Sequence, residues 1–296
     1  MEIGLGTVQF GLNYGVSNSL GKTNLIDVFE ILNEAKNFNI DYLDTAPFYG
    51  NSETVIGSYH LIEQFKIVTK ISPSKKTLIN GDDINIIREK FERSLERLHA
   101  KAVYGLLIHN AADLTAKGGE KIFEFLQSMK SQGRVTKIGI SIYPEDDLSF
   151  ILKSFAFDLI QLPLNVLDHR LLKNGTLETC KNKGMEIHVR SAFLQGLLLM
   201  DIKQIPAYFD PIKSTIITFN DACKSRGISN VEGVYGFIRS IPYIDVVLIG
   251  VNNKDQLKAN IESWNRMGKE GFPGIDYSSF SVEQKEFINP SLWRLS

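Results

Sequence analysis

The segment NLIDVFEILNEAKNFNIDYLDTA, residues 24–46, decides the fold because a helix pattern runs directly into a strand pattern. Within residues 24–38, apolar side chains recur at spacings of three and four, which places them on one helix face: Leu25, Val28, Phe29, Leu32 and Ala35. Residues 40–46, IDYLDTA, form a short apolar run without strict alternation, as expected of a strand covered on both faces. A helix joined to a buried strand is the repeating unit of an α/β protein.

The same alternation of strand and helix patterns continues along the whole chain. Further strands are predicted at 4–11, 66–72, 104–110, 136–142, 157–163, 185–191 and 244–250. Further helices are predicted at 82–100, 120–133, 145–155, 167–183, 213–226, 230–240 and 253–267, with Asp82 and Asp83 as caps of the first and Gly133 as the end of the second. About eight strand-and-helix units without a linker predict a single-domain (β/α)8 TIM barrel over residues 1–296, with residues 268–296 as a C-terminal cap segment.

An open doubly wound sheet is the main alternative fold. Such a sheet usually carries a glycine-rich phosphate-binding turn that opens a helix after the first strand. GLGTVQFG (4–11) contains Gly-x-Gly, but GTVQF is not expected to open a helix, so the motif gives this alternative weak support. The barrel is therefore preferred.

The composition excludes several classes of function. Hydrophobic content is 43% and net charge is −1, so nothing favours nucleic acid or an anionic membrane as a partner. The two cysteines, Cys180 and Cys223, are predicted to be reduced and half-buried, and no disulfide or metal-ligand spacing occurs. The N-terminus does not have the pattern of a signal peptide, and no apolar run approaches the roughly 20 residues of a membrane span. A cytoplasmic location is expected.

Polar residues follow most of the predicted strands. In a barrel of this kind, active sites lie where the strands end. The polar residues nearest those ends are Asp44, Lys70, His109, Ser141, Gln161, Arg190 and Ser191. Each has an ordinary explanation by itself, such as a solvated charge or a turn cap, but the barrel brings all of them to one face. The Lys70 ammonium can supply the positive charge that a buried carboxylate at Asp44 needs.

Three of these side chains, together with the nearby Tyr49, would suit proton transfer to a carbonyl oxygen if they surround one cavity: Asp44, Lys70 and His109. Lys70 is expected to lower the pKa of Tyr49, and Asp44 is expected to keep Lys70 charged. Tyr49 would then be the general acid, and His109 would orient the carbonyl. Protein groups supply no hydride, so a nicotinamide cofactor is required. The predicted reaction is carbonyl + NAD(P)H + H⁺ ⇌ alcohol + NAD(P)⁺.

Over nearly its whole length the chain resembles the aldo-keto reductase family. The blocks that carry the resemblance are GLGTVQFG, YLDTAPFYGNSE, IVTK, LLIHN, IGIS, IQLPLN, VRSAFLQGLLL and LIGVNNKDQLKAN, of which DTAPFYGNSE is the most specific. In that family an Asp, a Tyr, a Lys and a His form the catalytic tetrad. The resemblance places these roles on Asp44, Tyr49, Lys70 and His109.

The resemblance also implies a set of cofactor-binding residues. Ser141 and Gln161 would hold the nicotinamide carboxamide, and the segment RSAFLQGLLL would lie along the pyrophosphate. The residues implied there are Arg190, Ser191, Phe193, Gln195, Gly196 and Leu197. The family often stacks an aromatic side chain on the nicotinamide from the end of the seventh strand, and this chain has none near Arg190.

The block LIGVNNKDQLKAN would bind the adenosine end of the cofactor. The residues implied are Gly250, Val251, Asn252, Gln256 and Asn260. Many NADPH-using members of the family have cations where this chain has Gly250 and Gln256. Lys254 is the candidate replacement that would pair with the 2′-phosphate. NADPH is therefore expected, with NADH as the alternative.

Other functions and the identity of the substrate remain open at this point. Lys70 could form a Schiff base as in aldolases, or the chain could be a cofactor-binding regulatory protein with little turnover. GTVQFGLNYGVSN resembles a bacterial subgroup linked with surface-polysaccharide and sugar-nucleotide pathways, so a sugar or keto-sugar is the expected substrate and a generic aldehyde the second choice. The aromatic residues expected to line the cavity are Phe10, Tyr14, Phe48 and Tyr143. A monomer is expected.

Overall fold

The computed structural model describes residues 1–267 and 274–295, so residues 268–273 of the predicted cap lie outside the described residues. Eight parallel strands close into a barrel in chain order. They are β1 (Glu2–Gly6), β2 (Tyr42–Asp44), β3 (Lys66–Ile71), β4 (Val103–Ile108), β5 (Val135–Ser141), β6 (Leu159–Pro163), β7 (Glu186–Arg190) and β8 (Val246–Ile249). The predicted TIM barrel is confirmed, and the open doubly wound sheet is wrong.

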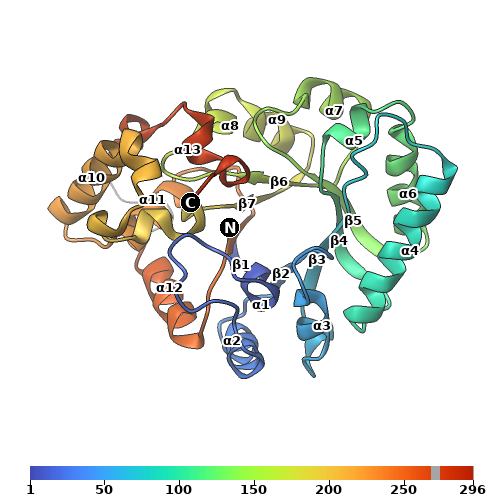
Figure 1. The fold of residues 1–296 in the computed structure, drawn as a ribbon, viewed down its shortest axis with the longest axis horizontal. Helices are drawn as coiled ribbons and strands as arrows, with labels where there is room; N and C mark the ends of the chain where they lie inside the picture. Colours follow the sequence, from blue (N-terminus) through green and yellow to red (C-terminus); the bar gives the residue numbers. More distant parts are fainter. Residues whose placement is uncertain (268–273, 296) are drawn as a thin grey trace.

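The helices lie outside the strands, and the chain closes its circuit with the last long helix beside the first (Figure 1). The longer helices are α2 (Leu25–Asn37), α4 (Gly81–Arg97), α6 (Glu120–Ser131), α7 (Leu148–Ser154), α9 (Thr176–Asn182), α10 (Asp210–Ser225), α11 (Asn230–Arg239) and α12 (Lys254–Arg266). Shorter helical turns are α1 (Val8–Gly11), α3 (Ser52–Gly57), α5 (Ala112–Thr115), α8 (Arg170–Lys173) and α13 (Lys285–Ile288).

Hydrogen bonds at the helix ends explain where the sequence and the structure differ. Asp82 and Asp83 were expected to cap the predicted helix at 82–100. In the structure, Asn80 is the cap of α4 and accepts from the backbone N–H of Asp83. The Asp83 carboxylate returns a bond to the N–H of Asn80 and completes a capping box. The predicted helix at 167–183 is two helices, because Gly175 adopts a left-handed backbone with φ +75°.

The first strand is shorter than its pattern predicts. β1 ends at Gly6, because both the N–H and the hydroxyl of Thr7 turn to the carbonyl of Asp44. Val8–Gly11 then forms the short helix α1, so the expectation that GTVQF opens no helix is wrong. Gly11 is required there: a Cβ atom would lie 1.7 Å from the carbonyl oxygen of Tyr49. This contact fixes the loop that carries Tyr49 against the end of β1.

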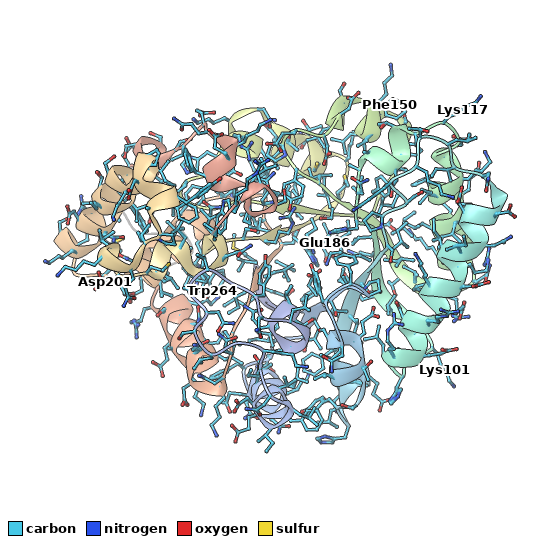
Figure 2. The ribbon with its side chains drawn as sticks, in the orientation of Figure 1. Lys101, Lys117, Phe150, Glu186, Asp201 and Trp264 are labelled. Atoms are coloured by element: carbon cyan, nitrogen blue, oxygen red, sulfur yellow. The ribbon has the colours of Figure 1, made fainter. Side chains whose placement is uncertain are left out.

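A polar cluster fills the N-terminal end of the barrel. The Glu186 carboxylate accepts from the Tyr104 hydroxyl at 2.7 Å, pairs with Lys137, and contacts Nε2 of His188 at 2.6 Å. Figure 2 shows Glu186 in the centre of the ring of strands, whereas Lys101 and Asp201 lie at the periphery. Because these side chains occupy the N-terminal end of the barrel, a ligand cavity is expected at the opposite end, where the strands finish.

The described part of the C-terminal segment covers the barrel near β6. The N–H of Val282 donates to the carbonyl of Leu167 at 2.8 Å, and Trp293 packs edge-on against Phe209 with ring centroids 4.8 Å apart. The cap expected from the sequence is therefore present for residues 274–295.

The remaining global expectations concern cysteines and membrane spans. Both cysteines are free but fully buried rather than half-buried. Burial raises the pKa of Cys180 to about 11 and that of Cys223 to about 12, so neither thiol is reactive at neutral pH. Within residues 1–267 and 274–295, no helix combines the length and apolar character that crossing a membrane would need.

Candidate active site

A cavity of about 630 Å³ opens at the C-terminal ends of the strands. It contains all four side chains of the predicted catalytic set. It also contains most of the predicted cofactor set: Ser141, Gln161, Arg190, Ser191, Phe193, Gln195, Gly196, Gly250, Asn252, Gln256 and Asn260. The closed barrel explains the convergence, because strands far apart in sequence end on one face.

Asp44 and Lys70 form a buried ion pair in the floor of the cavity. The Lys70 ammonium donates to both Asp44 oxygens, at 2.7 and 2.9 Å, and to the carbonyl of Thr45 at 3.0 Å. The two residues are 5% and 2% exposed, respectively. Burial lowers the pKa of Lys70, and the Asp44 carboxylate opposes that shift. Because its three N–H groups are all bonded, Lys70 is held as an ammonium ion.

The block DTAPFYGNSE is held by a second group of hydrogen bonds behind the cavity. The Ser52 hydroxyl donates to the Thr7 carbonyl at 2.9 Å and lies 3.2 Å from the Thr45 hydroxyl, which ties α3 to the ends of β1 and β2. Glu53, 2% exposed, accepts from Thr69 on β3 and from Arg97 on α4. The Arg97 guanidinium neutralises this buried carboxylate. The network holds this block in place behind the cavity.

Tyr49 lies beside the ion pair, with its ring centroid 5.2 Å from the Lys70 ammonium. Burial raises the pKa of Tyr49 well above its ordinary value, Asp44 adds to the rise, and Arg190 opposes it. The expectation of a lowered pKa is therefore wrong: loss of water around the phenol and the Asp44 charge outweigh the Arg190 cation. Tyr49 remains protonated at neutral pH, which is the form that a proton donor requires.

His109 completes the catalytic set and is neutral. Its ring lies 4.3 Å from that of Phe48. Burial lowers its pKa from 6.5 to about 4, and the Lys70 and Arg190 cations act in the same direction. Its Nδ1 atom is buried without a hydrogen-bond partner among the described residues. A neutral imidazole of this kind can donate to or accept from a substrate oxygen.

The pKa of His109 predicts a pH-dependent stability. The unfolded chain takes up a proton on His109 near its ordinary pKa of 6.5, whereas the folded protein resists protonation down to about 4. The stabilising contribution of the neutral ring is therefore complete above about pH 6.5 and lost as the pH falls towards about 4. Between about pH 7.5 and about pH 5, the unfolding free energy of the wild type should fall by about 2 kcal/mol more than that of His109→Gln. Urea unfolding at both pH values measures this difference, and equal losses would contradict it.

The floor of the cavity presents one amide acceptor that fits a nicotinamide carboxamide. Gln161 donates from Nε2 to Asp44 at 2.7 Å, and its Oε1 atom is buried without a partner among the described residues. Ser141 lies next to it in register on β5. An NH₂ donor from a ligand would satisfy Oε1, so this pair fits the carboxamide role implied by the resemblance.

The segment after β7 has an unusual backbone. Ser191, Leu194 and Gln195 adopt positive φ angles of 61°, 48° and 55°. Left-handed non-glycine residues cost about 1–3 kcal/mol each and tend to cluster at functional sites. Gly196 was expected to allow a close approach of phosphate. In the structure its close neighbour is Ser17, because a Cβ atom on Gly196 would lie 1.8 Å from the Ser17 hydroxyl.

A loop from the start of the chain crosses the cavity and joins two of its walls. Gln195 donates to the Tyr14 hydroxyl at 3.2 Å, and Asn252 donates to Asn18 at 3.3 Å. Sequence reasoning missed this loop as part of the site, apart from Tyr14. The lining residues it missed include Gln9, Gly15, Ser17, Asn18, Pro290 and Ser291. The Gly-, Asn- and Ser-rich run GLNYGVSN was the available signal for a loop near the site.

Some expected contacts are not made. The side chains of Leu197 and Val251 belong to the hydrophobic core, so only their backbone could face a ligand. Phe10 is also a core residue, at 1% exposure, and does not line the cavity, whereas Tyr14 and Tyr143 do. Lys254 turns away from the cavity and forms an ion pair with Glu30 on α2 at 3.0 Å. It is therefore not placed as a clamp for a 2′-phosphate.

Comparison with known proteins finds relatives that are named as a reductase and as dehydrogenases. The chain is 29% identical to the NADH-specific methylglyoxal reductase of Escherichia coli (strain K12) over 67% of this chain and 65% of that protein, which is less than two thirds of its length. It is 26% identical to the D-arabinose 1-dehydrogenase of Saccharomyces cerevisiae over 88% of this chain and 86% of that protein. It is 25% identical to the L-galactose dehydrogenase of Arabidopsis thaliana over 79% of this chain and 77% of that protein.

A solved structure shares the fold, and a family model identifies the family. The aldo-keto reductase AKR11C1 from Bacillus halodurans superposes with a TM-score of 0.73 at 18% identity, covering 96% of this chain and 94% of that one. The model of the aldo/keto reductase family matches residues 2–276. The chain therefore belongs to the aldo/keto reductase family of oxidoreductases.

Proposed function

We propose that this protein is an NAD(P)H-dependent reductase that converts an aldehyde or ketone to an alcohol, with Tyr49 as the general acid. The observation that carries the proposal is the arrangement of a partly buried, protonated phenol, a buried ammonium ion and a partly buried, neutral imidazole around one cavity. Gln161 beside Ser141 fits the carboxamide of a nicotinamide cofactor, which supplies the hydride when bound.

Each protein group has a separate task in this reaction. Tyr49 donates its proton to the carbonyl oxygen as negative charge develops there. The Lys70 ammonium stabilises the resulting phenolate, and Asp44 holds that ammonium in place. The neutral His109 forms a hydrogen bond with the same oxygen and orients the carbonyl. The buried setting strengthens these electrostatic interactions, since little water screens them.

The bonding of Lys70 argues against the Schiff-base alternative. A Schiff base needs a neutral amine with a free lone pair. Lys70 directs its three N–H groups to Asp44 and Thr45, so no lone pair faces the cavity. The intact proton-transfer set likewise argues against a regulatory protein with little turnover. That alternative would gain support from cofactor binding by fluorescence without turnover of any carbonyl compound.

NADH is proposed as the preferred cofactor, in place of the NADPH expected from the sequence. The described residues that line the cavity beside α12 are neutral: Gly250, Asn252, Gln256, Ala259 and Asn260. The cation expected to bind a 2′-phosphate is paired with Glu30. The name of the Escherichia coli relative, an NADH-specific reductase, agrees with this choice.

Replacing Lys254 tests that assignment. Lys254→Ala should change the Michaelis constants for NADH and NADPH by less than about 2-fold, because its exposed ion pair with Glu30 lies outside the cavity. The measurement is steady-state kinetics with each cofactor at a saturating carbonyl concentration. A large rise in the NADPH constant alone would show that Lys254 does reach the 2′-phosphate.

The substrate proposed is a sugar or keto-sugar carbonyl, with a generic aldehyde as second choice. The names of two relatives, an L-galactose and a D-arabinose dehydrogenase, support a sugar. A screen of cofactor oxidation by absorbance across aldehydes, ketones and keto-sugars tests the whole proposal. Activity that Tyr49→Phe abolishes would support it, and absence of turnover with every carbonyl would refute it. The cytoplasmic location and the monomeric state stay predictions.

A further inference from the structure

Arg190 is an unpaired cation in the wall of the cavity. The charged residues that line the cavity are Asp44, Lys70 and Arg190, and the first two neutralise each other. Within residues 1–267 and 274–295, no carboxylate lies within ion-pair distance of the Arg190 guanidinium (compare the ion pairs of Arg97 and Arg170). The cavity therefore carries a net positive charge of one, located at the end of β7. The Asp146 carboxylate, which accepts from the backbone N–H of Tyr143, interacts with this charge from beyond ion-pair distance. A partly buried cation without an ion-pair partner favours an anionic ligand.

The guanidinium is fixed in direction and retains free donors. It donates from one terminal nitrogen to the carbonyl of Ile142 at 3.1 Å, and its central carbon lies 4.3 Å from the ring centroid of Tyr143. Both residues follow β5, so the side chain leaves β7 and crosses the end of β6. An arginine has five N–H donors, and one is used in the described structure. The others are available to a carboxylate or phosphate.

This direction separates Arg190 from the wall that suits the cofactor's phosphates and adenosine, and it brings the guanidinium towards Ser141 and Gln161, beside which the nicotinamide would bind. That wall is formed by the segment after β7, the loop after β8 and the start of α12, whereas the Arg190 guanidinium points towards β5. The guanidinium is close to the proton-transfer groups instead. Its charge lowers the pKa of His109 and opposes the rise in the pKa of Tyr49. An anion bound at Arg190 would therefore lie on a molecule whose carbonyl can reach Tyr49.

We infer that Arg190 binds a carboxylate or phosphate group of the carbonyl substrate and so makes the enzyme selective for anionic sugars or short anionic aldehydes. This inference rests on the proposed reductase function and replaces the cofactor role that the resemblance gives to Arg190. Tyr143 acts as a positioning residue, since its ring face holds the guanidinium plane.

Matched pairs of substrates test the inference. Succinic semialdehyde is compared with butanal for a carboxylate, and glyceraldehyde 3-phosphate with glyceraldehyde for a phosphate. In the wild type, kcat/KM should be higher for the anionic member of at least one pair. Arg190→Gln should lower kcat/KM for that anion by about 10- to 100-fold more than it lowers kcat/KM for the neutral partner, which loses only the effect of the Arg190 charge on Tyr49 and His109. Arg190→Lys should retain part of the preference, because it keeps the charge and loses the planar fork.

Controls separate this role from general charge and from cofactor binding. Arg93→Gln removes an exposed arginine on α4 and should leave both members of each pair unchanged. NADH affinity, measured by fluorescence, should be the same in the wild type and in Arg190→Gln. Weaker NADH binding in Arg190→Gln, or an equal loss for anionic and neutral substrates, would overturn the inference.

A binding experiment distinguishes failure of this inference from failure of the proposed function. Succinate and glycerol 3-phosphate carry the anionic groups but no reducible carbonyl. Calorimetric titration in the presence of NADH should show at least one of them binding to the wild type and not to Arg190→Gln. Such binding, together with no turnover of any carbonyl compound, would keep the anion site and refute the reductase. No binding of either anion, together with Tyr49-dependent turnover of neutral carbonyls, would refute the anion site and keep the reductase.

Discussion

Tyr49→Phe should lower kcat for carbonyl reduction by about 10²- to 10⁴-fold, the range contributed by a positioned general acid. The substitution removes one oxygen atom at the centre of the proposed chemistry and leaves the ring in place. The phenol is protonated and buried, with its ring next to the Lys70 ammonium. The cavity also holds Tyr14 and Tyr143, and of these three phenols Tyr49 is the one recorded with its ring beside the Lys70 ammonium. Water would have to deliver the proton in the variant, and the cavity wall leaves it poorly oriented.

The same substitution should leave the fold intact. The Tyr49 hydroxyl makes no side-chain hydrogen bond with another described residue, so its loss should change stability by no more than about 0.5 kcal/mol. Steady-state kinetics and urea unfolding measure both quantities. Tyr208→Phe is a matched control, since its hydroxyl bonds the Glu286 carbonyl away from the cavity. A Tyr49→Phe enzyme that keeps wild-type kcat would remove Tyr49 from the reaction, and an unfolded variant would contradict the structural expectation.

The sequence predicted the architecture well because strand and helix patterns are local properties of the chain. Their repeated alternation is typical of a parallel barrel. Each predicted strand overlaps an observed one, and neighbouring strands pair in chain order. Two boundaries failed, one because of a contact between distant residues and one because of a single left-handed residue. β1 ends early because Thr7 bonds the carbonyl of Asp44. The helix at 167–183 breaks at Gly175, where one left-handed residue interrupts an otherwise continuous apolar pattern.

In the site, the positions of residues along the chain were predictable, whereas features that depend on the assembled barrel were not. The convergence of the four proposed catalytic residues on one cavity was predictable because each lies at or just after a strand end. The direction of the Tyr49 pKa shift was not predictable, because burial depends on how completely the assembled barrel excludes water. The direction of Arg190 across the end of β6 depends on Ile142 and Tyr143, which lie about 50 residues earlier in the chain. The partner of Lys254 likewise required the packing of α12 beside α2.

Replacing Lys70 should have the largest effect on stability. Lys70→Met leaves the Asp44 carboxylate buried without a counter-ion, and breaking a buried pair in this way typically costs about 3–5 kcal/mol. Gln161 can still donate one hydrogen bond to Asp44, which places the expected loss towards the lower end of that range. Urea unfolding at neutral pH measures it. Lys258→Met, which removes a partly exposed pair with Glu34 at 3.5 Å, should cost less than about 1 kcal/mol.

A double-mutant cycle shows whether the loss arises from the uncompensated charge. In Lys70→Met/Asp44→Asn the side chain at position 44 is neutral and keeps an oxygen for the Gln161 donor. The double variant should therefore be more stable than Lys70→Met alone, with a coupling energy of about 1–3 kcal/mol. Additive losses would mean that Lys70 stabilises the barrel through its packing rather than its charge. Reductase activity should not return with stability, because the double variant still lacks the ammonium that stabilises the Tyr49 phenolate, so the cycle separates the structural task of the pair from its catalytic one.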